Sequence, residues 1–108
     1  MSETTITLTE DNFSETIDNN DIVFIDFWAS WCGPCRAFSP VYSAAAEANT
    51  DIVFTKVDVD DQPALASTFT ITSIPTLVAF KKGEILYAQA GALNSSQLNA
   101  VVDTVRSS

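Results

Sequence analysis

The segment from Ile22 to Trp28 constrains the fold more than any other part of the chain. It reads Ile-Val-Phe-Ile-Asp-Phe-Trp, so Asp26 is its single polar residue and the others are apolar. A short run of β-branched and aromatic residues is typical of a strand buried on both faces, as in parallel sheets. A second run of this kind, Ile52–Val57, predicts a second buried strand. The two runs favour an α/β domain whose early strands are parallel.

The rest of the chain alternates between helix and strand patterns. We expect additional strands at Ile6–Leu8, Thr76–Phe80 and Glu84–Ala90, with helices at Glu10–Asp18, from Cys32 or Pro34 to Ala48, after Asp60 or Asp61, and from Asn94 or Ser95 onward. The order β-α-β-α-β-α-β-β-α predicts a layered domain on a mixed sheet that becomes antiparallel at its end.

Local signals support these boundaries. Thr9 is expected to cap the first helix, and Asp60 or Asp61 the short helix that has Pro63 in its first turn. Pro40 is expected to kink the long helix because it removes one backbone hydrogen bond. The pair Lys82-Gly83 predicts a hairpin turn. The last helix carries an apolar face formed by Leu98, Val101, Val102 and Val105.

Composition excludes several classes of function. The chain has 108 residues, which suits a single domain over residues 1–108, and it contains no His and two Cys. Without His there is no Ser-His-Asp or Cys-His catalysis and no His-ligated metal. A net charge of −9 argues against nucleic-acid binding and favours the steering of basic partner surfaces. The absence of a secretory signal and of an apolar run near 20 residues predicts a cytoplasmic protein without a membrane span.

The sharpest chemical signal is the string Trp31-Cys32-Gly33-Pro34-Cys35. It lies where a buried strand passes into a helix, at the carboxyl end of the strand, where open α/β sheets tend to place their sites. The i, i+3 spacing puts both sulfurs on one side of the first helical turn. Free N–H groups at the helix start stabilise a thiolate at Cys32, and Cys35 lies one turn deeper. We therefore expect Cys32 to attack a substrate disulfide and Cys35 to resolve the mixed disulfide. Gly33 allows the turn and a close substrate backbone, and Pro34 stiffens the pair.

Two simpler explanations of the cysteine pair are disfavoured. Half of a zinc site would need two more sulfur or nitrogen ligands, and the chain has no third Cys and no His to supply them. A purely structural disulfide between close neighbours is uncommon in a cytosolic protein.

Asp26 and Lys56 are the charged residues of the two buried strands. A carboxylate buried without a partner is costly, so we expect the pKa of Asp26 to rise toward the range of a general base. The alternatives are a strand-end acid that reaches solvent and, for Lys56, a solvated strand residue.

The chain resembles the thioredoxin family from about Ile6 to Val105. The resemblance rests on Phe27–Cys35, Pro40, Ile74-Pro75-Thr76 and Gly91-Ala92. It implies the thioredoxin fold, a five-stranded mixed sheet with about four helices on both faces. It further implies a protein-disulfide reductase that acts on disulfide-containing target proteins and is re-reduced by an NADPH-dependent flavoprotein, thioredoxin reductase. The redox group would be the Cys32–Cys35 disulfide itself, with no bound cofactor or metal, in a monomer.

The resemblance also implies roles for single residues. Asp26 would exchange a proton with Cys35, and Lys56 would approach Asp26 and oppose the rise of its pKa. The Ile74–Pro75 bond would be cis, leaving Ile74 to offer backbone groups to an extended substrate. A flat apolar contact patch would comprise Trp31, Gly33, Pro34, Ile74 and Ala92, whereas Gly91 would either contact the substrate or simply turn the chain.

Two other functions compete with this interpretation. One is an oxidant or isomerase, which the Gly-Pro pair between the cysteines disfavours by analogy with the family. The other is a binding subunit whose apolar patch holds a partner without redox chemistry, and this role can coexist with the first.

Overall fold

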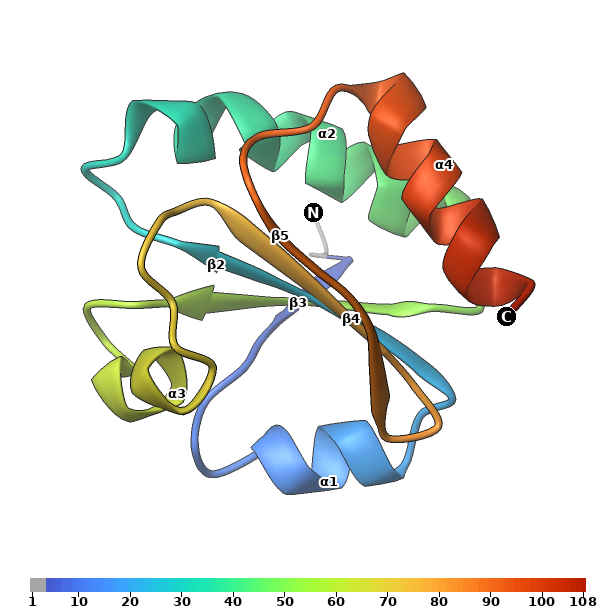
Figure 1. Cartoon of the computed structure of the whole chain (residues 1–108), viewed down its shortest axis with the longest axis horizontal. Helices are drawn as coiled ribbons and strands as arrows, with labels where there is room; N and C mark the ends of the chain where they lie inside the picture. Colours follow the sequence, from blue (N-terminus) through green and yellow to red (C-terminus); the bar gives the residue numbers. More distant parts are fainter. Residues whose placement is uncertain (1–3) are drawn as a thin grey trace.

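Five strands form one mixed sheet in the computed structural model, which describes residues 4–108 (Figure 1). The strands are β1 (Thr5–Thr7), β2 (Ile22–Trp28), β3 (Val53–Asp58), β4 (Thr76–Lys81) and β5 (Glu84–Ala90). Their spatial order is β1-β3-β2-β4-β5. The pairs of β3 with β1 and β2 are parallel, and β4 is antiparallel to both β2 and β5. The predicted change from parallel to antiparallel pairing is confirmed.

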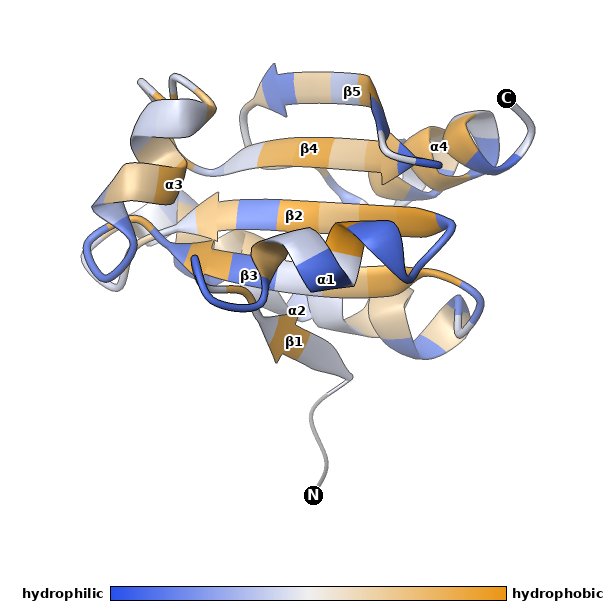
Figure 2. Ribbon diagram, turned by 90° about the horizontal axis from the view of Figure 1, so that it is seen from below, coloured by the Kyte–Doolittle hydropathy of each residue, from blue (hydrophilic) through white to orange (hydrophobic). Residues whose placement is uncertain are grey.

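Strand β2 occupies the centre of the sheet. Residues 22–27 are all buried, as the apolar run predicted. Its register places Asp26 directly beside Lys56 of β3 on one side and beside Leu77 of β4 on the other. Figure 2 shows the apolar character of β2 and β4 interrupted at one polar position in β2. The carboxylate of Asp26 is therefore buried at the centre of the sheet.

Four helices cover the two faces of the sheet in the described part of the chain (Figure 1). Helices α2 (Gly33–Ala48) and α4 (Ser95–Arg106) lie on one face, and α1 (Phe13–Asp18) and α3 (Pro63–Thr68) on the other. Helix α2 runs without interruption through Pro40. The predicted helices on both faces are confirmed.

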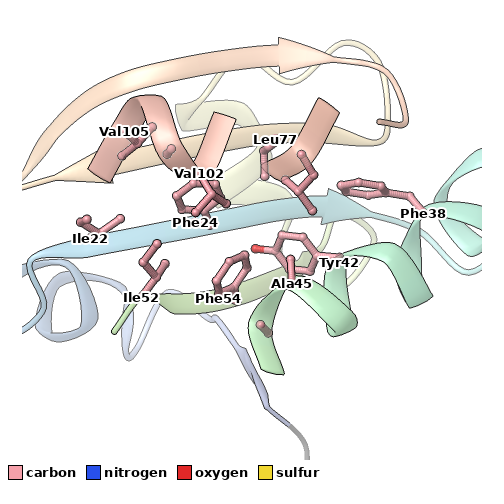
Figure 3. Packing of buried hydrophobic residues seen from close by; sticks show 13 residues of the cluster. Ile22, Phe24, Phe38, Tyr42, Ala45, Ile52, Phe54, Leu77, Val102 and Val105 are labelled. Carbon is pink, nitrogen blue, oxygen red and sulfur yellow. The ribbon is translucent and has the colours of Figure 1, made fainter. Parts of the chain in front are cut away.

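The larger core lies between the sheet and helices α2 and α4 (Figure 3). Phe24 and Phe54 project from adjacent strands toward Tyr42 of α2, and the ring centroids of Tyr42 and Phe54 are 5.3 Å apart. The Tyr42 hydroxyl donates a hydrogen bond to the Thr55 carbonyl oxygen at 2.7 Å. Leu98, Val102 and Val105 supply the buried face of α4, as predicted. These contacts fix α2, and with it the loop that precedes it, against β2.

The predicted start of the first helix is wrong by about one turn. The helix begins at Phe13 rather than Glu10, and Asn12 rather than Thr9 precedes it. The Asn12 side chain accepts a hydrogen bond from the Thr9 N–H and donates one to the Thr7 carbonyl oxygen. These bonds hold the segment before Phe13 in a separate turn, and the helix begins after it.

Smaller boundary errors have similar causes. The cap of α3 is Gln62, not Asp60 or Asp61, because the Asp58 side chain and carbonyl accept the N–H groups of the residues that follow it and close a turn. Pro63 does lie in the first turn of α3. Strand β1 ends at Thr7, but Leu8 is fully buried and its N–H still donates to the Lys56 carbonyl oxygen.

Candidate active site

The cysteine pair lies at the junction of β2 and α2. Cys32 is the N-cap of α2 and Cys35 is in its first turn, and the two form a disulfide with Cα atoms 5.2 Å apart. The predicted placement at the carboxyl end of a buried strand is confirmed. The buried strand and the packed helix hold the two sulfurs together at the carboxyl end of the central strand β2.

The start of α2 supplies a hydrogen bond to the outer sulfur. The Cys35 backbone N–H donates to Cys32 Sγ at 3.2 Å. In the reduced protein the same N–H and the positive end of the helix favour the thiolate form of Cys32. In the disulfide form Cys32 is 5% exposed and Cys35 2%, so the predicted difference in exposure has the expected direction but is small. Both cysteines pack with Ala29 against Trp28, Val59 and Ile74.

The loop before β4 faces the disulfide. The Ile74–Pro75 peptide bond is cis, as the resemblance implied. The Ile74 carbonyl oxygen lies 3.8 Å from Cys32 Sγ, and Pro75 is buried. The Pro75 carbonyl oxygen accepts a hydrogen bond from the Gly91 N–H at 2.8 Å. Gly91 has φ +115°, a conformation that favours glycine.

The apolar residues next to the cysteines in the sequence are exposed to solvent. Trp31 is 67% exposed, Gly33, Pro34 and Ala92 are exposed, and Ile74 is half-buried. The indole Nε1–H of Trp31 donates to Asp60 Oδ2 at 2.8 Å. Next to Trp31 lies a groove of about 160 Å³ lined by Trp31, Val59, Ala66, Ile71, Thr72, Ser73 and Ile74.

Sequence reasoning missed part of this groove. Val59 and Ile71 line it, and Asp60 holds the indole of Trp31, although Asp60 had been interpreted as a helix cap. These residues lie 28 or more positions from Trp31 in the sequence, and no local pattern connects them. The one usable signal was the position of Val59 and Asp60 directly after a strand parallel to β2, since such ends meet at one edge of the sheet.

Asp26 is the buried titratable group nearest in sequence to the junction of β2 and α2, where the disulfide lies. Its side chain is inaccessible, and within residues 4–108 neither carboxylate oxygen has a hydrogen-bond partner. Burial raises the pKa of Asp26 from 3.8 to about 7, and the positive charge of Lys56 opposes part of that rise. The predicted rise of the pKa is confirmed, and the alternative of a solvent-reaching acid is wrong.

Lys56 is half-buried on the same face of the sheet as Asp26. Its Nζ donates to Ser39 Oγ at 3.2 Å and lies 4.8 Å from the centroid of the Trp28 ring. The Lys56 ammonium therefore contacts α2 and β2 rather than extending freely into solvent, and it acts on Asp26 through its field.

No group of three or more His, Cys, Asp or Glu side chains within residues 4–108 is arranged to hold a metal ion. Over the same residues, no helix has the length and apolar character needed to cross a membrane. The chemistry that the described side chains do support is exchange between a dithiol and a disulfide.

The comparisons with known proteins agree with this geometry. A family model for thioredoxin matches residues 4–104. The chain belongs to the thioredoxin family. It is 51% identical over 102 residues to a putative thioredoxin 2 of Streptomyces coelicolor, covering 94% of this chain and 76% of that relative. It is 44% identical over 97 residues to a thioredoxin of Alicyclobacillus acidocaldarius, covering 89% and 92% respectively.

Solved thioredoxin structures share the fold. A thioredoxin of Plasmodium falciparum superposes with a TM-score of 0.86 at 35% identity, covering 93% of this chain and 98% of that one. A mutant thioredoxin of Halobacterium salinarum gives 0.87 at 33% identity, covering 97% and 94%. Family membership and the Cys32–Cys35 disulfide make this chain a thiol–disulfide oxidoreductase of the protein-disulfide reductase type. Its partners are disulfide-containing proteins and a reductase that restores the dithiol.

Proposed function

We propose that Cys32 is the nucleophile and Cys35 the resolving thiol. The Cys32 thiolate attacks one sulfur of a target disulfide, which forms a mixed disulfide and releases the other target sulfur as a thiolate. Cys35 then loses its proton and attacks Cys32 Sγ, which releases the second target thiolate. Two electrons pass to the target, and the chain is left with the Cys32–Cys35 disulfide. The observation that carries this proposal is the Cys35 N–H directed at Cys32 Sγ at the start of α2.

Asp26 is proposed as the group that accepts the proton of Cys35 and later returns it. Its pKa of about 7 lets it take or give a proton near neutral pH. The chain has no His that could do this work. Lys56 assists by keeping this pKa from rising further.

Target proteins are proposed to dock on the apolar surface formed by Trp31, Gly33, Pro34, Ile74 and Ala92. The surface combines an exposed indole with small residues that let a substrate backbone come close to Cys32. Pro75 and Gly91 shape its far side through their hydrogen bond. Because Ile74 lies beside Cys32 Sγ, an extended target segment would align its disulfide there.

The recycling partner and the location of the protein are part of the same proposal. The reductase is proposed to be an NADPH-dependent flavoprotein, and the chain an electron carrier that works as a cytoplasmic monomer. Residues 1–108 are proposed to form one thioredoxin domain with no bound cofactor or metal. Nucleic acid is not a proposed partner, since the net charge is −9. A membrane is not a proposed partner either, since no apolar run approaches about 20 residues.

Reduction of insulin disulfides with dithiothreitol tests the assignment of the cysteines. Cys32→Ser should abolish the reduction, and activity that survives this change would overturn the proposal. Cys35→Ser should accumulate mixed disulfides with targets, whereas the matched Cys32→Ser variant should not. Trapping by the wrong variant would reverse the two roles.

An equilibrium redox titration against glutathione separates a reductant from an oxidant. Thioredoxins have a reduction potential of about −270 mV, so a measured value close to this supports a reductase. A potential well above that range would instead favour an oxidant or isomerase.

A further inference from the structure

Ser39 connects the long helix to the one lysine that faces the buried acid. It lies in α2, four residues after Cys35 and therefore on the same side of the helix. Its Oγ accepts a hydrogen bond from Lys56 Nζ at 3.2 Å. Lys56 is the register neighbour of Asp26, and alternation along the two strands puts both side chains on the sheet face that α2 covers. Ser39 thus contacts the charge that acts on Asp26.

Two contacts together fix the Lys56 ammonium. One is the hydroxyl of Ser39, and the other is the face of the Trp28 ring, 4.8 Å from Nζ. A lysine side chain loses considerable rotamer entropy when it is held in one place, so contacts are needed to keep it there. The ring alone offers a modest cation–π attraction at a half-exposed position. The hydroxyl supplies the directional contact.

We propose that Ser39 is a positioning residue that holds the Lys56 ammonium beside the buried Asp26 carboxylate and thereby sets the proton affinity of Asp26. This inference rests on the proposed role of Asp26, because its consequence for the reaction is a shift in when Asp26 can take the proton of Cys35.

The groups packed around Asp26 make the direction of the effect definite. Lys56 comes from β3, Leu77 from β4 carries no charge, and α2 contributes the phenol of Tyr42. Tyr42 is neutral at physiological pH because burial and Asp26 both raise its pKa. Within residues 4–108, Lys56 is therefore the cation whose field lowers the pKa of Asp26. Without the Ser39 hydroxyl, the ammonium gains hydration by extending into solvent, where its field on Asp26 is screened.

The test is the pKa of Asp26 in oxidised Ser39→Ala, followed by NMR of the labelled side-chain carboxyl carbon. Alanine favours the helix, so the fold should be retained. The pKa of Asp26 should rise by at least about 0.5, which is a fraction of the effect of a neighbouring charge. Ser39→Thr, which restores a hydroxyl, should return it to the original value. Ser43→Ala, one turn further along α2, is the matched control and should leave the pKa unchanged.

A double-mutant cycle decides whether Ser39 acts through Lys56. Lys56→Met should raise the pKa of Asp26 at least as much as Ser39→Ala, and adding Ser39→Ala to it should change nothing more. An equal effect of Ser39→Ala with and without Lys56, an unchanged pKa, or a lowered one would overturn the proposal.

The pH profile of insulin reduction separates this inference from the role of Asp26. In Ser39→Ala the profile should move to higher pH together with the pKa of Asp26. If the pKa rises and the profile stays in place, Ser39 is confirmed as the positioning residue, and the proposed proton transfer by Asp26 is wrong.

Discussion

At the scale of single residues, burial in the folded protein favours the protonated form of Asp26. The folded protein binds the proton with a pKa of about 7, whereas the ordinary pKa of an Asp side chain is 3.8. The contribution of Asp26 to the free energy of unfolding should therefore be largest below about pH 4, fall as the pH rises to about 7, and then level off. Asp26→Asn should remove this decline and make the oxidised protein more stable at pH 8, by up to about 4 kcal/mol.

Urea unfolding of the oxidised protein between pH 4 and pH 8 checks this prediction, with both variants measured at each pH. Asp21→Asn is the matched control because Asp21 is exposed, and it should retain the decline of the wild type. An Asp26→Asn variant that loses stability with rising pH as steeply as the wild type would show that another group dominates the titration.

The burial of Asp26 could be predicted from the sequence, whereas the hydrogen bonds of Lys56 and Trp31 could not. Its burial follows from the apolar run around it, because a seven-residue strand of that composition has no solvent-facing side. The hydrogen bonds of Lys56 with Ser39 and of Trp31 with Asp60 join residues 17 and 29 positions apart. They depend on how α2 and the loop after β3 pack against the sheet. No local sequence pattern predicts that packing.

At the scale of elements, α4 depends on the residues at its start. The Asn94 side chain accepts from the Gln97 N–H at 2.8 Å, and the Gln97 side chain accepts from the Asn94 N–H at 2.9 Å, which completes a capping box. Asn94→Ala removes one of these bonds and should lower the free energy of unfolding by about 1 kcal/mol.

Chemical denaturation measures the cost, and insulin reduction should proceed at close to the wild-type rate because the substitution leaves Cys32 and Cys35 unchanged. Ser96→Ala, at an exposed position inside the same helix, is the control and should change stability by less than about 0.5 kcal/mol. Equal losses in the two variants would mean that the capping box contributes little.

The helix starts also show where prediction from sequence fails at this scale. The start of α4 is predicted at Asn94 or Ser95, and the structure has Asn94 as the cap and Ser95 as the first helical residue. At α1 and α3 the side chains of Asn12 and Asp58 bond to backbone groups of turns that precede the helix. Asx side chains satisfy either a turn or a helix start, and only the surrounding structure selects between them.

At the scale of the whole molecule, the excess of acidic residues governs how targets approach. Fourteen Asp and Glu stand against five Lys and Arg. Several of these cations are already engaged: Arg106 pairs with Asp51, Lys81 bonds to the carbonyl oxygens of Arg106 and Ser108, and Lys56 bonds to Ser39. The molecule as a whole therefore presents a negative field to an approaching partner.

Two disulfide-bonded peptides of equal length, one flanked by lysines and one by glutamates, test this field. Raising the ionic strength from about 0.01 M to about 0.15 M shortens the Debye length from about 30 Å to about 8 Å. The kcat/KM for the lysine peptide should fall roughly threefold or more, and that for the glutamate peptide should rise, because attraction and repulsion are both screened. An uncharged disulfide such as bis(2-hydroxyethyl) disulfide should show no trend. If the two charged peptides responded alike, recognition would depend on the apolar surface around Trp31 and Ile74 alone, and the net charge would have no part in selecting targets.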